Sequence, residues 1–396
     1  RIIILIIMWS LFTTMCVCVY LLLEYLALAN EIVPELLPND SSLFSAIYNS
    51  QEIKRCIIND TKVIIPNNTY YIHPIYCENI HNTILQIDGK LISHPSIDKW
   101  PKNNTYNDIF NLDTIRNFTI KGNGSLDGQG AIWWEHALEH RKKDLRGCMF
   151  RIRKAKELFI TGIKVINSPK FYFNIKNSKG IYIDNIEIDT KWDKKQSYFP
   201  FNTDGIDIEG SNVIISNSKI TNYDDAVAIK PHKIESCTKD ILVENMTVKY
   251  GVGMSVGSVP PNEKINCIEN VIFRNIHFHE PIKAIYIKTN PGNHGYGLIN
   301  NITYENIKIH SPKWFSLYVG PQQQKEPDGD GPGCLLYPIE KCPTEPRITI
   351  GNITFKNITS DKDTLNVLRC NETNPCKNFN FIDVDIKGHF IIENVN

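Results

Sequence analysis

The segment Asn270-Val-Ile-Phe-Arg-Asn-Ile-His-Phe decides the fold. It contains two short runs in which apolar and polar residues alternate, and Asn275 separates the two runs. Alternation with a period of two, carried by β-branched and aromatic residues, is typical of half-buried strands. The same phrase returns in Asn301-Ile-Thr-Tyr-Glu-Asn-Ile-Lys-Ile, so we predict that the chain repeats one two-strand unit.

The hinge of this unit is an asparagine in six copies, at Asn185, Asn217, Asn245, Asn275, Asn306 and Asn357. Most hinges are about 28 to 32 residues apart, which is the period of stacked solenoid coils. No long segment after residue 29 has an apolar stripe of helical period, so we expect little helix. The predicted fold class is therefore all-β, a single-stranded parallel β-helix (solenoid) with an N-terminal cap, in which the hinge asparagines stack coil on coil. On this interpretation Asn245 and Asn357 point inward, and their sequons stay unglycosylated.

The repeat divides the chain into three segments. Residues 1–29 are strongly apolar and end in Ala27-Leu28-Ala29, which is typical of a signal peptide, with a retained signal anchor as the alternative. Residues 30–110 lack the repeated phrase and are predicted to form an N-terminal cap and the first coils. Residues 111–396 are predicted to form the β-helix domain, in which the Gly- and Pro-rich segment 320–346 is a long loop.

Composition narrows the class of partner. The chain has 43 basic and 43 acidic residues, so no polybasic field is available to hold nucleic acid or an anionic membrane. Sequons of the type Asn-x-Ser/Thr recur along the chain, as expected of a secreted, extracellular glycoprotein. A capped solenoid exposes no long sheet edge, so we expect a monomer without membrane contact once the leader is removed.

The cysteines fit an oxidising compartment. Two of the 11 lie in the leader segment, and Cys148 is expected to be a buried free thiol. The spacing of the others suggests four disulfide pairs, of which the last two are the weaker inference: Cys334 with Cys342, Cys370 with Cys376, Cys56 with Cys77, and Cys237 with Cys267. No spacing of Cys and His resembles a zinc site, so we expect no metal and no cofactor.

Three carboxylates lie on neighbouring coils. Asp204 occurs in Asn202-Thr203-Asp204-Gly205, and Asp224 and Asp225 are adjacent one coil later. Because stacked strands are about 4.8 Å apart, side chains one coil apart on the same face come close together. Such crowding raises at least one pKa, so that a protonated acid can stand beside an ionised base. The alternatives are a turn residue for Asp204 and a solvated pair or calcium ligand for the other two.

These motifs resemble the polygalacturonase family, the pectin-degrading glycoside hydrolase family 28. The phrases that carry the resemblance, in the family's order, are Asp127-Gly-Gln-Gly, Asn167-Ser-Pro, Asn202-Thr-Asp, Asp224-Asp225 and Gly251-Val-Gly-Met-Ser-Val-Gly-Ser. The resemblance implies a right-handed parallel β-helix and a secreted hydrolase that cleaves α-linked galacturonan or a related pectic polysaccharide with inversion. It implies that Asp224 is the general acid and that Asp204 and Asp225 activate the attacking water. An inverting acid and base are expected to be about 6.5 to 9.5 Å apart.

The chain departs from the family at two positions. Val252 stands where the family usually has His, and Tyr286 stands where it usually has Arg, in the phrase Ile285-Tyr286-Ile287-Lys288. In the family that His supports the acid, while the Arg and the Lys hold the substrate's carboxylate. Lys288 is therefore expected to bind the uronate, whereas Tyr286 can stack on a sugar face but cannot neutralise an acid. Asn202 is the third residue expected to bind substrate.

Three other functions stay open at this point. The first is an exo-acting or rhamnogalacturonan-type pectin hydrolase. The second is a pectate-lyase-like enzyme, which would need calcium and an arginine base, although Arg274 is the one arginine between residues 204 and 290. The third is a catalytically impaired β-helix that binds polysaccharide, an alternative favoured by Val252 and Tyr286.

Overall fold

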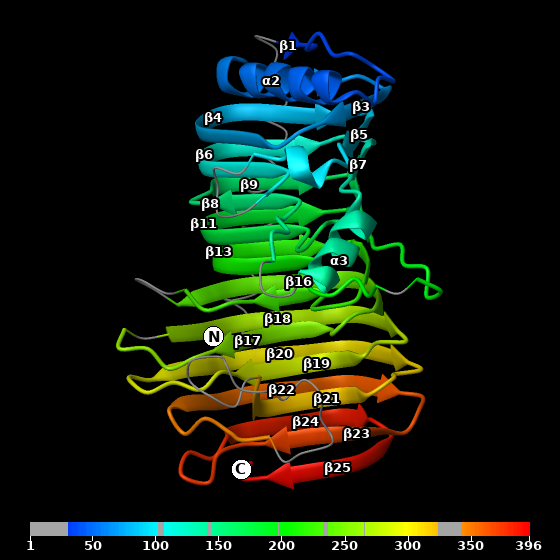
Figure 1. Cartoon of the computed structure of the whole chain (residues 1–396). Coiled ribbons are helices and arrows are strands. Elements are labelled where there is room, and N and C mark those ends of the chain that lie inside the picture. Colours follow the sequence, from blue (N-terminus) through cyan, green and yellow to red (C-terminus); the bar gives the residue numbers. More distant parts are fainter. Residues whose placement is uncertain are drawn as a thin grey trace.

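The computed structural model describes residues 31–101, 107–140, 144–196, 198–232, 237–264, 266–323 and 342–396. These residues form a right-handed parallel β-helix, as predicted, whose coils follow one another along a single axis (Figure 1). Most strands pair in parallel with the strand two places later in the chain, and a few with the strand one or three places later, so each coil hydrogen-bonds to the next. The segment 1–29 expected to be a leader lies outside the described residues.

The strands form rows that run the length of the solenoid. One row consists mainly of long strands. Its members are β1 (Glu31–Ile32), β2 (Lys62–Ile65), β4 (Ile75–Ile87), β6 (Phe110–Lys121), β8 (Phe150–Arg153), β9 (Lys156–Thr161), β11 (Phe173–Asp184), β13 (Ile206–Ser216), β16 (Thr238–Tyr250), β18 (Asn266–His279), β20 (Gly297–His310), β22 (Ile348–Ser360) and β24 (Lys377–Asp385). Shorter strands continue the first coils in β3 (Thr69–Ile72), β5 (Lys90–Ser93), β7 (Ser125–Asp127), β10 (Lys164–Ile166), β12 (Glu187–Asp189) and β14 (Lys219–Asn222). A last row contains β15 (Val227–Ile229), β17 (Met254–Val259), β19 (Lys283–Thr289), β21 (Phe315–Gln322), β23 (Thr364–Arg369) and β25 (Gly388–Glu393).

The core is one continuous apolar column inside the coils. Isoleucines fill most of it, and aromatic rings stack from coil to coil, as Phe110 on Phe150 and Phe150 on Phe173, with centroids 5.1 Å and 5.0 Å apart. Offset stacking of this kind adds about 0.5–1.5 kcal/mol per pair to the area buried. Because equivalent residues repeat at every coil, the interior is a set of side-chain ladders, and the predicted repeat is the cause of the fold.

The predicted asparagine ladder exists, but it points outward. The Nδ2 of Asn245 donates to Asn217 Oδ1, that of Asn275 to Asn245, that of Asn306 to Asn275, and that of Asn357 to Asn306, at 2.9–3.1 Å. Each of these residues is exposed and has a φ of 51–56°, the left-handed conformation that Asn tolerates. A left-handed residue bends the strand and leaves two consecutive side chains outside, so the prediction that Asn245 and Asn357 point inward is wrong.

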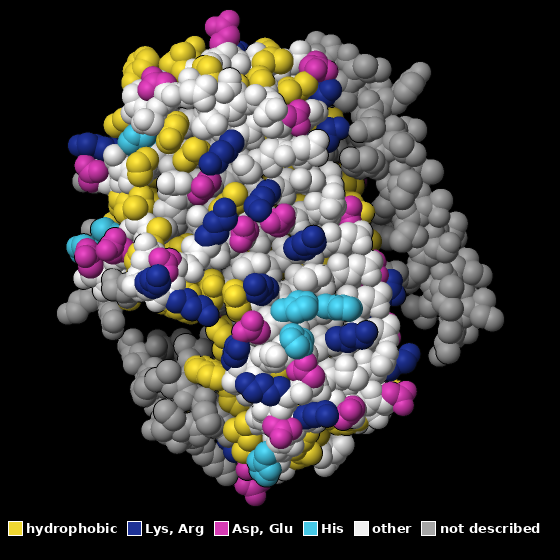
Figure 2. Space-filling model, turned by 90° about the vertical axis from the view of Figure 1, so that its right-hand side faces the viewer, with side chains coloured by type: hydrophobic (Ala, Val, Ile, Leu, Met, Phe, Trp, Pro, Cys, Tyr) yellow, Lys and Arg dark blue, Asp and Glu magenta, His cyan; other side chains and the backbone are white. Residues whose placement is uncertain are grey.

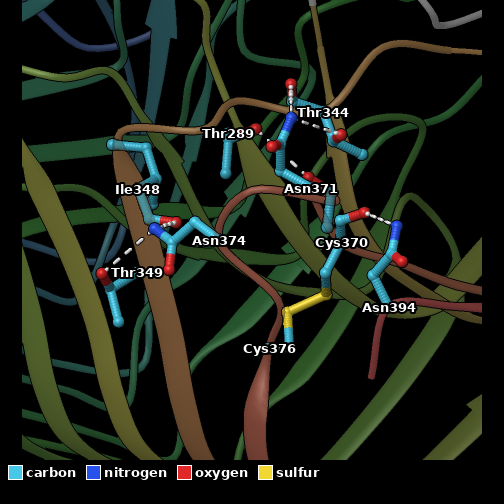
Figure 3. Close-up of a disulfide and its surroundings, with 10 residues drawn as sticks. Thr289, Thr344, Ile348, Thr349, Cys370, Asn371, Asn374, Cys376 and Asn394 are labelled. Carbon is cyan, nitrogen blue, oxygen red and sulfur yellow. Dashed lines mark hydrogen bonds between the residues drawn. A yellow bond between two sulfur atoms is a disulfide. The ribbon is translucent and has the colours of Figure 1, made fainter. Parts of the chain in front are cut away.

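Two of the predicted disulfides form, and one does not. The structure contains Cys237–Cys267 and Cys370–Cys376, and the second fixes a tight loop in which Asn371 and Asn374 donate to backbone carbonyls (Figure 3). The prediction of a Cys56–Cys77 bond is wrong, since both are free thiols that pack separately in the apolar core. Cys148 is a buried free thiol, as expected. Cys334 lies outside the described residues, so its bond to Cys342 stays a prediction.

Helices close and flank the solenoid. The helix α2 (Leu43–Asn59) covers the N-terminal end of the core, and Ser42 caps it by accepting a hydrogen bond from the Ser45 N–H (Figure 1). The helix α3 (Gly130–Glu139) buries Trp133 and Trp134 completely, and a short 3₁₀ turn, η1, spans Ile97–Lys99. Among the described residues, no helix is long and apolar enough to cross a membrane. Basic and acidic side chains interleave on the face shown in Figure 2, in keeping with the balanced charge.

Candidate active site

The candidate site lies where four successive coils are in register. Ile206 of β13 pairs with Val227 of β15, Val227 pairs with Met254 of β17, and Met254 pairs with Ile285 of β19. The positions two residues earlier on each coil therefore form one column, which is Asp204, Asp225, Val252 and Lys283. Strand spacing puts neighbours in such a column about 4.8 Å apart.

The structure brings the three predicted carboxylates together. One oxygen from each of Asp204, Asp224 and Asp225 lies within 4.8 Å of the other two. Asp204 and Asp225 are buried, whereas Asp224 is half-buried. By this measure the groups are closer than the 6.5 to 9.5 Å expected of an inverting acid and base. Three ionised carboxylates this close repel one another strongly, so the site holds at least one proton over a wide range of pH.

Asp225 is held as an anion. Its Oδ2 accepts hydrogen bonds from Lys288 Nζ at 2.7 Å and Lys230 Nζ at 3.4 Å, and its Oδ1 accepts one from Ser255 Oγ at 2.6 Å. Burial alone would raise the pKa of this carboxyl, but the two lysines and these hydrogen bonds lower it to about 2. Asp225 is therefore ionised at neutral and at mildly acidic pH.

The other two carboxyls hold the proton. Burial, together with the charges of Asp224, Asp207 and Asp225, raises the pKa of Asp204 well above its usual value. Burial and the neighbouring Asp225 also raise the pKa of Asp224, although the Asp225 N–H donates to its Oδ1 at 2.9 Å. Asp204 Oδ1 is buried and accepts no hydrogen bond. In this arrangement the proton is therefore favoured on Asp204, and it is shared with Asp224.

Asn202 shapes the site through its backbone. It has a φ of 55°, and its N–H donates to Asp224 Oδ2 at 3.1 Å. Its side chain is turned away, because Asn202 Oδ1 accepts a hydrogen bond of 3.0 Å from Arg146. The guanidinium of Arg146 also stacks on Phe201, 3.8 Å from the ring centroid, and donates to the Phe201 carbonyl. Arg146 thus fixes the turn that presents the Asn202 N–H to the predicted acid.

Tyr286 lies at the site but does not face solvent. It is buried in a second apolar cluster outside the main core, with Phe315, Tyr318, Cys342, Val367 and, at its edge, Val252. Its ring faces two ammonium groups, since Lys283 Nζ lies 3.9 Å and Lys288 Nζ 4.5 Å from the ring centroid. Val252 and Tyr286, the two positions at which the sequence was expected to depart from the family, therefore belong to one apolar cluster.

Four site residues did not emerge from the sequence. Ser255 and Lys230 hold Asp225, Arg146 holds Asn202, and Lys283 joins the aromatic cluster. Ser255 lies in a phrase that the resemblance already contained, and Lys230 follows Asp225 by one short strand, so both were within reach of the motifs. Arg146 and Lys283 gave no signal, because their places depend on coil register rather than on sequence spacing.

The acidic cluster is also the one group of His, Cys, Asp and Glu, within the ranges that the structure describes, whose atoms come close enough to share a metal ion. Two lysine ammonium groups already lie at hydrogen-bonding distance from Asp225. A cation there would meet these like charges, so the arrangement fits proton transfer better than metal binding.

Comparison with known proteins agrees with this geometry. A probable polygalacturonase of Arabidopsis thaliana is 30% identical over 213 residues, which cover 54% of this chain and 42% of that protein. An exopolygalacturonase of Cochliobolus carbonum is 33% identical over 219 residues, which cover 52% of this chain and 46% of that protein. These matches span less than half the length of either relative.

A solved structure extends the likeness of fold to almost the whole chain. The endo-xylogalacturonan hydrolase from Aspergillus tubingensis superposes with a TM-score of 0.73 at 18% identity, covering 92% of this chain and 96% of that one. The family model for glycosyl hydrolases family 28 matches residues 58–396, a range that contains every coil from β2 onward and the whole carboxylate cluster. The chain belongs to family 28 of the glycosyl hydrolases.

Proposed function

We propose that this protein hydrolyses the glycosidic bonds of α-linked galacturonan or a related pectic polysaccharide. The observation that carries the proposal is the convergence of Asp204, Asp224 and Asp225, two with a raised pKa and one with a lowered pKa. Glycoside hydrolysis needs a protonated acid and an ionised base at one pH, and carboxyls in different surroundings supply both. Membership of family 28 supports the same reaction class.

In the proposed mechanism Asp224 is the general acid, because it is the half-buried member of the three and can reach a leaving oxygen. Its proton passes to that oxygen as the bond to the anomeric carbon breaks. Water attacks the same carbon and gives up a proton to the pair Asp204 and Asp225, of which Asp225 is already ionised. The proton that Asp204 and Asp224 share must then reside on Asp224 when substrate is bound.

The stereochemical outcome tests the proposed single displacement. A separation below the usual inverting range would also suit a double displacement with a covalent intermediate. We propose inversion because Asp225 is held by two ammonium groups and a hydroxyl, which makes it a poor nucleophile. Proton NMR of the first product formed distinguishes the two outcomes. Initial release of the β-anomer from an α-linked substrate supports inversion, and initial release of the α-anomer requires the covalent route.

The decisive test of the acid is Asp224→Asn. We expect hydrolysis of polygalacturonate to fall by about 10²–10⁴, because an amide cannot protonate the leaving oxygen. The loss should nearly disappear on an aryl galacturonide whose leaving group needs no proton. Asp204→Asn is the matched variant, and its loss should persist on the activated substrate, since water activation is still required. The opposite pattern would exchange the two roles.

Substrate recognition is proposed to rest on Lys288, whose ammonium would attract a uronate carboxylate. Of the other two residues expected to bind substrate, Tyr286 would support this ammonium with its ring, and Asn202 would act through its backbone N–H on Asp224. Exo action and a rhamnogalacturonan-type substrate are alternatives within the same proposal. We further propose that the protein acts as an extracellular monomer, released after removal of its leader. A panel of pectic polymers, read by product length and by reducing ends, separates these substrates.

A binding protein without catalysis is the second candidate, and Val252 and Tyr286 favour it. Neither residue can support an acid or neutralise a carboxylate, and both are held in apolar packing. If correctly folded protein binds polygalacturonate but releases no reducing ends, this candidate is established and the proposed hydrolase activity is ruled out.

A further inference from the structure

Lys283 is a buried lysine that forms no direct contact with an anionic side chain among the residues that the structure describes. It is 2% exposed, as buried as Lys288. Its Nζ forms no ion pair or hydrogen bond with any residue that the structure describes. It lies instead among three rings, 3.9 Å from the centroid of Tyr286, 4.5 Å from that of Tyr318 and 5.8 Å from that of Phe315. A buried ammonium without an anionic partner is costly unless something else compensates it.

The surrounding rings explain how the charge is tolerated but not why it is there. Aromatic rings attract a cation, but this attraction does not by itself offset the cost of taking an ion out of water. A methionine would fill the same space without this cost. The presence of an ammonium at this position therefore points to a ligand that carries the opposite charge.

Lys283 is aligned with the catalytic carboxylates. Coil register places it in the column of Asp204, Asp225 and Val252, directly after Val252. Its ammonium group lies 3.9 Å from the ring centroid of Tyr286, and that of Lys288 lies 4.5 Å from the same centroid. The two lysines thus flank the residue that stands where the family usually has Arg.

We infer that Lys283 is the second cation of the substrate site and binds the carboxylate of a galacturonate residue together with Lys288. Tyr286 holds the two ammonium groups apart and supports each with its ring. The cation missing from position 286 is in this way supplied from the strand position three residues earlier. This inference rests on the proposed function, because it assigns the recognition of acidic substrate at the same site.

Binding of a carboxylate should also change the protonation of Lys283. Burial, and next the neighbouring Lys288, lower the pKa of the Lys283 ammonium to about 7, while Asp225 and Asp224 oppose the shift. The titratable groups that face it are Lys288 and Tyr286 on its own strand, Tyr318 on β21, Cys342, and Asp224 and Asp225 on the preceding coils. A carboxylate placed beside Lys283 raises its pKa again, so binding above pH 7 takes up a proton.

The test measures binding rather than turnover, in the Asp224→Asn background. Isothermal titration calorimetry compares trigalacturonate with its neutral methyl ester for Lys283, Lys283→Met and Lys283→Arg. We expect Lys283→Met to weaken the acidic ligand at least tenfold and the ester less than twofold, and Lys283→Arg to restore most of the preference. Proton uptake at pH 7.5, read from buffers of different ionisation enthalpy, should disappear in Lys283→Met. Thermal unfolding should show Lys283→Met to be at least as stable as the parent.

Failure of this inference is distinguishable from failure of the proposed function. If the unsubstituted protein cleaves polygalacturonate but the ratio of acid to ester affinity is the same with Met at position 283, the inference is wrong and the hydrolase stands. If trigalacturonate binds through Lys283 but no pectic polymer is cleaved, the hydrolase is wrong and the inference stands. An equal loss of both ligands in Lys283→Met, with lowered thermal stability, assigns Lys283 a purely structural role.

Discussion

Replacement of Lys288 by Met tests the electrostatic balance of the site through stability alone. Lys288 Nζ lies 2.7 Å from Asp225 Oδ2, and the two side chains are 3% and 2% exposed. Removing one partner of a buried ion pair leaves an uncompensated charge and costs about 3–5 kcal/mol. Because Lys230 Nζ stays 3.4 Å from the same oxygen, we expect the lower end of this range, about 3 kcal/mol at pH 6.

The pKa of Asp225 determines how this loss of stability depends on pH. The pKa of Asp225 is lowered from 3.8 to about 2 in the folded protein, which corresponds to about 2 kcal/mol of stability. This contribution is fully present above pH 3.8 and is lost as the pH falls towards 2. In Lys288→Met it is largely absent at every pH. The difference in the free energy of unfolding between the two proteins should therefore shrink between about pH 4 and pH 2.

Urea-induced unfolding, followed by tryptophan fluorescence at several values of pH, measures the difference. The matched control is Lys62→Met, which removes an ammonium at 2.8 Å from Glu31 Oε2, where the side chains are 22% and 51% exposed. An ion pair this exposed contributes less than about 1 kcal/mol. The reasoning is refuted if Lys288→Met costs no more than the control, or if its cost is the same at pH 6 and at pH 2.

Two further predictions concern the proton and the turn. Lys230 lowers the pKa of Asp204 and of Asp224, so Lys230→Met should move the alkaline limb of the pH profile of kcat/KM to higher pH. An unchanged alkaline limb would show that Lys230 does not set the pKa of these carboxyls. Asn202→Gly should keep kcat within about threefold, because glycine adopts the left-handed φ and retains the N–H that donates to Asp224. A large rise in KM for Asn202→Gly would show instead that the Asn202 side chain binds substrate.

The repeat made most of the fold predictable, but it did not predict the helix α2 at the N-terminal end of the solenoid. Apolar and polar residues alternate in the sequence of the coils because each coil buries every second side chain in one core. The helix α2 escaped prediction because it covers only the end of the core, and its apolar face is correspondingly interrupted by Ser45, Asn49 and Ser50. The helix is preceded by Ser42, a typical N-cap residue, but a single capping residue leaves no trace in apolar periodicity.

The orientation of the asparagine ladder shows a second limit of pattern analysis. Strict alternation would place Asn275 according to its neighbours Arg274 and Ile276, but a left-handed φ breaks the alternation at that residue. Two consecutive side chains, Arg274 and Asn275, then face outward. The recurring asparagine predicted the bend correctly. Whether its amide points into the core or outward depends on the φ angle of the residue, which the sequence does not reveal.

At the site, the sequence predicted the three carboxyls but not all of the groups that set their pKa values. Asp204, Asp224 and Asp225 could be predicted because they belong to short motifs on consecutive coils. Lys288, which lowers the pKa of Asp225, lies two coils farther along and reaches the site only through register. Coils of unequal length hide this register from any analysis of spacing.

The geometry of a solenoid gives a physical reason why a recognition residue can be exchanged along the chain. Positions in one column differ by a single strand spacing of about 4.8 Å, and a lysine side chain is long enough to span that distance. Within one strand, too, Lys283 and Lys288 both bring an ammonium group within 4.5 Å of the ring centroid of Tyr286, so a cation can reach this place from more than one position. A carboxylate has no such freedom, because proton transfer requires contact with the reacting atoms. We therefore expect the reaction to tolerate a change in the position of a lysine better than a change in the position of Asp204, Asp224 or Asp225.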